Sequence, residues 1–407
     1  MGTTERAQPR PPVLVVHPGA ELYGADRVLL ESATALADRF DVTVALPGPG
    51  PLVAELERRG LRVVLCRMPV LRNAALRPRG TVRLVADAVL GALPALWLLR
   101  RYGVAGAYVN TLTLPSWPLL ARVARRRSVC HVHEAERSAP RLLRRGMAVC
   151  PVLADRVIVN SRFTLEVLTE VAPRLRARST VVLNGIPAPG EVLPPRTELD
   201  GPLRLLFVGR LSPRKGPQVA VAALQELLGR GVDARLQLLG SVFEGYEWFE
   251  AELRRTVADQ GLADHVEFLG FRTDVWPHLS RADVVLVPSV AEESFGNTAV
   301  EAVLAARPVV VSDSSGLREA VSGYRSAQAV APGRTTDWAD AIQRVADDWP
   351  TFLAAAGVDA REAAARHAQT GFRERLVAVV ESLTADRSSG SRPVERPPAA
   401  AVVASTG

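Results

Sequence analysis

One short segment of the chain combines positive charge with glycine in a way that suits an anionic ligand. It runs Gly209-Arg-Leu-Ser-Pro-Arg-Lys-Gly216, between an apolar run that predicts a strand, Leu203–Val208, and a pattern that predicts a helix, Pro217–Leu228. Backbone amides at the start of a helix attract anions, and Arg210 and Lys215 can add charged hydrogen bonds to a phosphate. This is not a Walker A loop, because Lys215 is followed by glycine. Alone, the segment indicates a site for some anion or else a solvated turn.

Lys215 is unusual because it is the only lysine in the chain; the other 49 of the 50 basic residues are arginine. Lysine is a compact point charge on a flexible stem, so the two residues are not equivalent at a phosphate. A single lysine can survive by chance. Its place beside Arg210 is what makes it a candidate.

A second polar loop follows the predicted strand Asp283–Val287. It carries Glu293, and Glu301 falls on the helix that comes next. Backbone amides of Ser294 to Thr298 would open that helix, and carboxylates beside them can accept hydrogen bonds from sugar or ribose hydroxyls. For either glutamate alone, a charge at a helix start or on a solvated face is the simpler explanation.

The elements that must position these loops form a regular alternation. Short apolar runs alternate with helical patterns in both halves of the chain, which is typical of βαβ units and a mostly parallel sheet. We therefore predict an α/β fold with two Rossmann-like domains in tandem, and ligands beyond the carboxyl ends of the strands. The predicted segments are a first domain at 12–186, a Pro/Gly-rich linker at 187–202, a second domain at 203–355, a helical stretch at 356–385 that could pack back on the first domain, and a disordered tail at 386–407.

The excess of positive charge lies wholly in the first half of the chain. Residues 1–200 hold 28 arginines against 17 acidic residues, and residues 201–407 hold 22 basic against 26 acidic residues, so the net charge of +7 divides into +11 and −4. A basic half attracts an anionic membrane surface or a nucleic acid, although a solvated basic surface explains it equally well. Aromatic residues are only 5% of the chain and do not interleave with the basic ones, so no nucleic-acid partner is expected.

The longest apolar stretch, Val82–Leu99, is interrupted by Arg83, Asp87 and Pro94, which argues against a membrane span. We predict a buried helix here, with an interfacial helix resting on a membrane as the alternative. The polar, proline-rich start shows no signal-peptide pattern, and the three cysteines lack CxxC spacing. These features favour a cytoplasmic protein, peripheral on the inner membrane face if it meets a membrane.

Taken together and in order, several stretches resemble the retaining glycosyltransferases of family 4, which have the GT-B fold with a cleft between two Rossmann-like domains. The resemblance covers about residues 12–385. The matching stretches are Gly24-Ala-Asp-Arg-Val28, His133-Glu134, Val159-Asn-Ser-Arg-Phe163, Leu183-Asn-Gly-Ile186, Gly209–Gly216, Glu293 with Glu301, Pro308–Asp313 and Gly316-Leu-Arg-Glu319. In the first of these, Ala25 replaces the second glycine of the family pattern.

The resemblance implies a role for each matching residue. Arg210 and Lys215 would bind the donor diphosphate and stabilise charge on the leaving group. Glu301 would bind the nucleotide ribose, Glu293 would contact donor-sugar hydroxyls, and His133 would reach the sugar near the reacting carbon. The remaining donor-binding positions would be Gly24, Ser294, Phe295, Gly296, Asn297 and Thr298.

The expected reaction needs no metal and no cofactor besides the nucleotide-sugar co-substrate. The chain has no D-x-D triplet, and Cys130, His131 and His133 lack a fourth ligand at finger-like spacing. Cations would replace Mg²⁺. His17, which ends the first predicted strand, either borders the cleft or only packs there.

The predicted partners are a nucleotide-diphosphate sugar and a glycan, lipid-linked or small-molecule acceptor, as in polysaccharide biosynthesis. Two alternatives are another GT-B chemistry, such as an epimerase or a phosphorylase, and a non-catalytic sugar-nucleotide-binding partner protein. A phosphorylase would need a lysine for pyridoxal phosphate, and the anion segment already contains the only one. The sequence does not specify the nucleotide base, the sugar or the acceptor.

Overall fold

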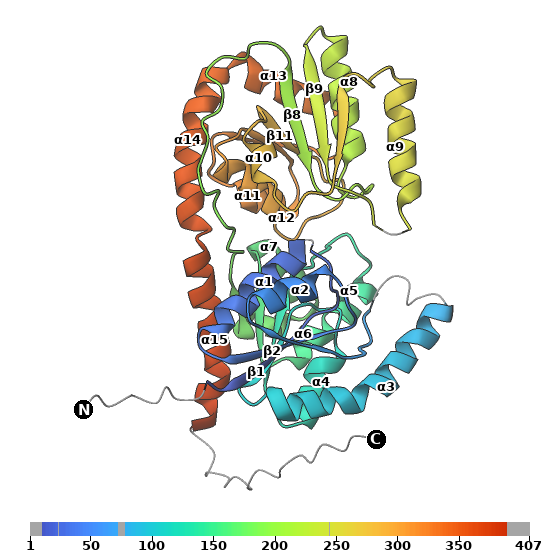
Figure 1. Cartoon of the computed structure of the whole chain (residues 1–407), viewed down its shortest axis with the longest axis vertical. Helices are drawn as coiled ribbons and strands as arrows, with labels where there is room; N and C mark the ends of the chain where they lie inside the picture. Colours follow the sequence, from blue (N-terminus) through green and yellow to red (C-terminus); the bar gives the residue numbers. More distant parts are fainter. Residues whose placement is uncertain (1–9, 23, 72–77, 244, 389–407) are drawn as a thin grey trace, which may run out of the picture.

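The structure is a computed structural model that describes residues 10–22, 24–71, 78–243 and 245–388. In these residues the chain forms two α/β domains that are stacked along the long axis of the molecule (Figure 1). Both sheets are parallel in every pair described, as the alternation of elements predicts. The predicted tail at 386–407 lies outside the described residues from residue 389 onward.

The amino-terminal domain is built on a seven-stranded sheet with the order β3-β2-β1-β4-β5-β6-β7. Its strands are β1 Pro12–Val16, β2 Asp41–Leu46, β3 Arg62–Leu65, β4 Gly106–Val109, β5 Ser128–Val132, β6 Arg156–Val159 and β7 Ser179–Val181. Its helices are α1 Gly24–Ala37, α2 Pro51–Arg58, α3 Pro78–Tyr102, α4 Ser116–Val123, α5 Arg141–Met147, α6 Val149–Leu153 and α7 Arg162–Val171, followed by a 3₁₀ helix at Pro173–Arg178.

The carboxy-terminal domain is built on a six-stranded sheet with the order β10-β9-β8-β11-β12-β13. Its strands are β8 Leu203–Val208, β9 Ala234–Leu239, β10 Val266–Gly270, β11 Val284–Val287, β12 Val309–Ser312 and β13 Ala327–Val330. The helices of this half are α8 Pro217–Gly229, α9 Glu247–Asp259, α10 Trp276–Leu279, α11 Asn297–Leu304, α12 Ser315–Val321, α13 Thr335–Asp347, α14 Trp349–Arg366 and α15 Gln369–Ser388.

Burial on both faces explains why apolar runs locate most strands. In β1, Val13 and Val15 enter the core on one side of the sheet and Leu14 and Val16 enter the core on the other, all fully buried. A parallel strand covered on both faces is apolar along its whole length. The sequence pattern does not predict β13, because Val330 is the only buried residue of this short strand.

The helical stretch predicted at 356–385 is two helices, α14 and α15, which run beside both domains (Figure 1). Helix α14 packs against α11 of the carboxy-terminal domain. Helix α15 crosses to the amino-terminal domain and packs against α1 there. Its side chains in the amino-terminal core are three or four residues apart and are Phe372, Leu376, Val380 and Leu383.

The prediction that Val82–Leu99 is a buried helix is wrong. Helix α3 forms, but only 22% of its most apolar 18-residue stretch is buried. Its last turns pack into the domain through Ala95, Leu98 and Leu99, while its amino-terminal half projects from the body of the molecule (Figure 1). A predominantly apolar sequence does not indicate how much of a helix packs against a core. Among the described residues, this helix alone is long and apolar enough to cross a membrane.

We expect Phe372→Ala to lower the free energy of unfolding by about 3–5 kcal/mol, the usual cost of removing a core phenylalanine. The ring is buried against Gly185, where a Cβ atom would lie 2.7 Å from the Phe372 Cβ. Urea unfolding measures the change. Arg375→Ala, at an exposed position of the same helix, is the control and should change stability by less than about 0.5 kcal/mol. Equal effects of the two substitutions would contradict the docking of α15.

Candidate active site

Two loops at the carboxyl edge of the second sheet are joined by an ion pair. Lys215 lies in the loop after β8, and its Nζ atom is 2.8 Å from Oε1 and 2.9 Å from Oε2 of Glu293, in the loop after β11. Ser289 donates a hydrogen bond of 2.8 Å to the same carboxylate. The structure thus brings together two residues that are 78 positions apart and that the sequence predicts to serve one site.

Glycine allows these loops to approach each other closely. Gly216 begins α8 with a φ of +74°, and a Cβ atom there would lie 1.9 Å from the Pro288 carbonyl oxygen. Only glycine adopts this conformation at no steric cost and leaves that space open. The amide of Val290 donates to the Arg214 carbonyl at 2.8 Å, which fixes the two loops side by side.

Arg210, at the start of the first loop, is held differently from Lys215. Its guanidinium carbon is 3.5 Å from the ring centroid of Phe243, in the loop after β9. Stacking on an aromatic face favours a cation and orients its planar fork. Both predicted diphosphate ligands are therefore positioned by neighbours within the carboxy-terminal domain.

In the predicted donor-binding run at the start of α11, two residues shape the helix start and two provide its first backbone amides. Gly296 caps the helix with a φ of +119°, and Phe295 before it is buried, with its ring 5.6 Å from that of His367. Burial lowers the pKa of His367 to about 4. Asn297 and Thr298 form the first turn, where backbone amides are available to an anion.

Ser294 and Asn297 connect the two domains. Asn160 donates to the Ser294 hydroxyl at 3.2 Å, and Ser161 donates to the Ser294 carbonyl at 2.5 Å. Asn184 donates to the Asn297 side-chain oxygen at 2.8 Å. Asn160, Ser161 and Asn184, from the family-like stretches after β6 and β7, thus make contacts across the domain interface.

Glu319, on α12 of the carboxy-terminal domain, makes further hydrogen bonds across the same interface. Its carboxylate accepts hydrogen bonds from the backbone amides of Arg162 and Phe163, at 3.0 and 3.1 Å. These amides open α7, where the positive end of the helix dipole favours a carboxylate. A carboxylate of the carboxy-terminal domain therefore caps helix α7 of the amino-terminal domain.

Glu301, on α11, faces a residue of the amino-terminal domain. Arg27 of α1 lies with Nη1 4.0 Å from Glu301 Oε1 and donates from Nη2 to the Thr273 carbonyl at 2.9 Å. Burial raises the pKa of Glu301, and Arg27 opposes that shift. Gly24 begins the same helix, and a Cβ atom there would meet no protein atom within 4 Å. The Gly24 stretch therefore lies across from the predicted ribose ligand.

A chain of buried polar groups supports His133 in the amino-terminal domain. His17 follows β1, Asn110 follows β4 and His133 follows β5, so all three lie at the carboxyl edge of the sheet. Asp26 Oδ1 is 2.7 Å from His17 Nε2, Asn110 Nδ2 is 3.1 Å from His17 Nδ1, and Asn110 Oδ1 is 2.8 Å from His133 Nε2. His17 is buried, and both of its ring nitrogens are engaged by Asp26 and Asn110, so its place in the structure is to support Asn110 and, through it, His133.

Hydrogen-bond roles in this chain of groups follow from the amide of Asn110. Its NH2 group only donates, so His17 Nδ1 accepts from it and His17 Nε2 donates to the Asp26 carboxylate. The Asn110 oxygen then accepts from His133 Nε2. His133 is left with Nδ1 as an acceptor, and burial lowers the pKa of its imidazole to about 3. The ring is therefore a neutral hydrogen-bonding group.

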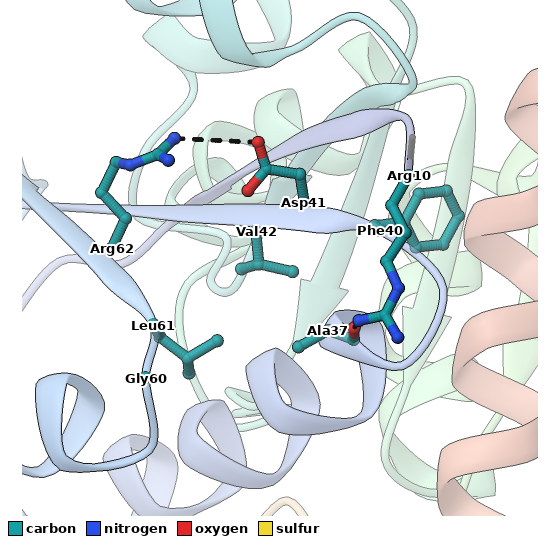
Figure 2. A pocket seen from close by; sticks show the side chains of 8 residues that line it. All are labelled: Arg10, Ala37, Phe40, Asp41, Val42, Gly60, Leu61 and Arg62. Carbon is teal, nitrogen blue, oxygen red and sulfur yellow. Dashed lines mark hydrogen bonds and ion pairs between the residues drawn. The ribbon is translucent and has the colours of Figure 1, made fainter. Parts of the chain in front are cut away.

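A separate hollow of about 230 Å³ lies in the amino-terminal domain, beside the starts of β2 and β3. Figure 2 shows its lining residues, with Asp41 and Arg62 forming an ion pair of 3.8 Å. Both residues are the first of their strands. Ligands of open parallel sheets bind at the opposite, carboxyl edge, so this hollow is not the candidate active site.

Comparison with known proteins agrees with this arrangement. The family model described as Glycosyltransferase Family 4 matches residues 23–188, and the one described as Glycosyl transferases group 1 matches residues 202–348. A D-inositol 3-phosphate glycosyltransferase of Mycobacteroides abscessus is 32% identical over 329 residues, which cover 77% of this chain and 69% of that protein. The chain belongs to the family 4 glycosyltransferases.

Further similarities place this glycosyltransferase among enzymes of varied substrates. Glycogen synthase of Mycobacterium tuberculosis is 33% identical over 200 residues, covering 48% of this chain and 46% of that enzyme. The crystal structure of Anabaena Alr3699/HepE in complex with UDP and glucose has a TM-score of 0.77 at 22% identity, covering 92% of this chain and 100% of that one. The GT-B fold predicted from the sequence is confirmed.

Sequence reasoning did not assign Arg27, Asp26 or Asn110 to the site. Asp26 and Arg27 lie within the family-like stretch that begins at Gly24, and their position in it would have indicated both as site residues. Asn110 ends an apolar run, as His17 does. A search for polar residues directly after buried strands would therefore have found Asn110, whereas Asp26 and Arg27 lie on α1 and are indicated only by the family-like stretch.

We expect the His133 imidazole to stay neutral from about pH 5 to about pH 8 in an NMR titration, because burial lowers its pKa to about 3. The folded pKa is below the unfolded value of about 6.5, so the unfolded chain binds more protons between these values. The free energy of unfolding should consequently fall as the pH drops from about 6.5 toward 3. His133→Asn assigns the resonance, and a titration midpoint near 6.5 would contradict the expectation.

Proposed function

We propose that this glycosyltransferase moves a hexose from a nucleotide-diphosphate sugar to a glycan, lipid-linked or small-molecule acceptor, with retention of the anomeric configuration and without a metal. The ion pair between Lys215 and Glu293 carries the proposal. It places a cation and a hydroxyl-binding carboxylate together at the carboxyl edge of a parallel sheet, beside the starts of two helices. A sugar diphosphate has phosphates that suit the cation and hydroxyls that suit the carboxylate.

The diphosphate would bind against Arg210 and Lys215. Both residues lie in the loop between β8 and α8, and their positive charges would stabilise the charge that develops on the leaving diphosphate. Fixed cations at that place substitute for the role that Mg²⁺ has in other phosphate sites. This supports a metal-independent reaction with the nucleotide sugar as its only co-substrate.

The ribose would bind to Glu301. A buried carboxylate accepts hydrogen bonds from hydroxyls most strongly when it is ionised. Arg27, at 4.0 Å, favours that ionised form against the effect of burial. Since Arg27 comes from the other domain, donor binding and domain closure would involve the same carboxylate.

The donor sugar would lie between Glu293 and His133. Glu293 would accept hydrogen bonds from sugar hydroxyls, and the Lys215 ammonium group, which has three donors, would contact both Glu293 and the diphosphate. The neutral His133 ring offers Nδ1 as an acceptor, because Nε2 donates to Asn110. A neutral ring at this place orients a hydroxyl rather than transferring a proton at neutral pH. The acceptor would attack from the front face, and the leaving phosphate would take its proton.

The comparisons support the donor class more than the acceptor. Alr3699/HepE was crystallised with UDP and glucose, and the curated relatives are named for inositol phosphate and glycogen. These acceptors differ chemically, so we keep the acceptor class broad. Polysaccharide biosynthesis on the cytoplasmic side of a membrane is the setting that we propose.

A thermal-shift screen of UDP, GDP, ADP and TDP sugars tests the donor assignment. One nucleotide sugar should raise the free energy of unfolding by about 2.7 kcal/mol at 100 times its dissociation constant. The same shift is expected in EDTA and in Mg²⁺, because the phosphate ligands are Arg210 and Lys215. A shift that EDTA abolishes and Mg²⁺ restores would overturn the metal-free assignment. NMR of the anomeric proton in the product then tests retention.

We expect Lys215→Ala to lower kcat by about 10²–10³, the usual cost of removing one group that stabilises developing charge. Turnover of the donor identified by the screen measures the loss. Arg230→Ala is the matched control, since it breaks an ion pair with Glu226 and Asp340 at the other end of α8. Both variants should keep the melting temperature of the parent, and wild-type turnover in Lys215→Ala would reject the diphosphate assignment.

A further inference from the structure

An exposed apolar stripe runs along helix α3 on the outside of the amino-terminal domain. Its members are Val82, Val85, Val89, Leu93 and Trp97, each between 57% and 78% exposed. They are three or four residues apart, so they share one face of the helix. Helix α4 packs on α3 and exposes Leu119 and Val123 in addition. We name the α3 residues the α3 stripe.

Packing of the last turns fixes α3 to the domain. Gly91 lies against the backbone of the segment after β3, where a Cβ atom would be 2.2 Å from the Arg67 carbonyl oxygen. Ala95, Leu98 and Leu99 are buried in the core below. The helix therefore cannot leave the domain to span a bilayer without losing these contacts. Its exposed face suits a surface on which the helix can lie flat.

Arginines and aromatic rings cluster at the carboxyl end of the stripe. Trp97 and Tyr102 meet edge to face at 5.9 Å, and the Arg62 and Arg101 guanidinium groups lie 5.6 and 5.8 Å from the Tyr102 ring centroid. Arg126 donates to the last turn of α3, at the Arg100 carbonyl, over 3.1 Å. Tryptophan, tyrosine and arginine side chains are the usual occupants of the boundary between water and lipid.

The positive charge around α3 indicates which kind of partner its exposed face can bind. The segment 78–127, which includes α3 and α4, has eight arginines and one acidic residue, Asp87, a net charge of +7. Asp87 lies 3.8 Å from Arg83. A second copy of the chain would bring the same positive charge to the interface and repel it, whereas an anionic lipid surface attracts it.

We propose that α3 docks the amino-terminal domain on an anionic membrane surface, with the α3 stripe in the lipid headgroup region and the arginines around Tyr102 at phosphate level. The docking goes beyond the proposed reaction, because it depends on α3 and not on the donor loops. It gives the lipid-linked acceptor class a physical basis. The hollow near β2 and the buried histidines contribute nothing to it.

Vesicle co-sedimentation of the full chain tests the proposal. The chain should bind phosphatidylcholine vesicles that contain phosphatidylglycerol and bind pure phosphatidylcholine at least about tenfold more weakly. Binding should decrease at about 1 M salt, where the Debye length is about 3 Å. Val89→Glu combined with Leu93→Glu should weaken binding at least about tenfold, because charges replace the centre of the stripe.

Val358→Glu is the matched control, since Val358 is also exposed but lies on α14 against the other domain. It should bind vesicles like the parent. All variants should keep the melting temperature and the donor-induced shift, so loss of vesicle binding is separable from failure of the proposed reaction. Absence of vesicle binding by the parent, or unchanged binding by the double variant, would overturn the proposal. A dimer in sedimentation that the double variant dissociates would also overturn it, in favour of a second copy on this face.

Discussion

The ion pair between Lys215 and Glu293 is the contact on which the geometry of this site depends. It joins loops from two adjacent strands, β8 and β11, and the close approach of Gly216 to Pro288 leaves no space for a side chain at residue 216. The pair keeps a cation and a carboxylate at one point of the sheet edge before any ligand arrives. Preorganised charge of this kind does not need to reorganise when charge develops on a leaving group.

The two domains contribute groups of different character to the same region. The carboxy-terminal domain presents charge, through Arg210, Lys215 and the two glutamates. The amino-terminal domain presents Arg27, opposite Glu301, and the His133 ring, whose Nε2 is held by the links from Asp26 through His17 and Asn110. Hydrogen bonds through Ser294 and the capping of α7 by Glu319 keep the two edges facing each other, and α15 ties the end of the chain to the first domain.

Helix α3 shows that one predominantly apolar helix can be buried at one end and exposed along the rest. Its last turns complete the core of the domain, and its other face remains exposed with arginines and aromatic rings at one end. The same apolar residue types face a protein core in one case and lipid in another, so residue type alone does not distinguish the two environments. The tertiary packing, which here covers Ala95, Leu98 and Leu99, decides between the two.

The sequence by itself determined the two parallel α/β domains, the loops at their carboxyl edges and the glycosyltransferase family. Apolar runs such as Leu203–Val208 coincide with strands because both faces are buried, and a parallel sheet collects the following loops at one edge. Only the tertiary structure decided which polar residues meet: Arg27 with Glu301, His17 with Asp26, Asn160 with Ser294. It also decided that most of α3 is exposed. These contacts join residues far apart in the chain, and their existence depends on packing between elements, which local pattern does not encode.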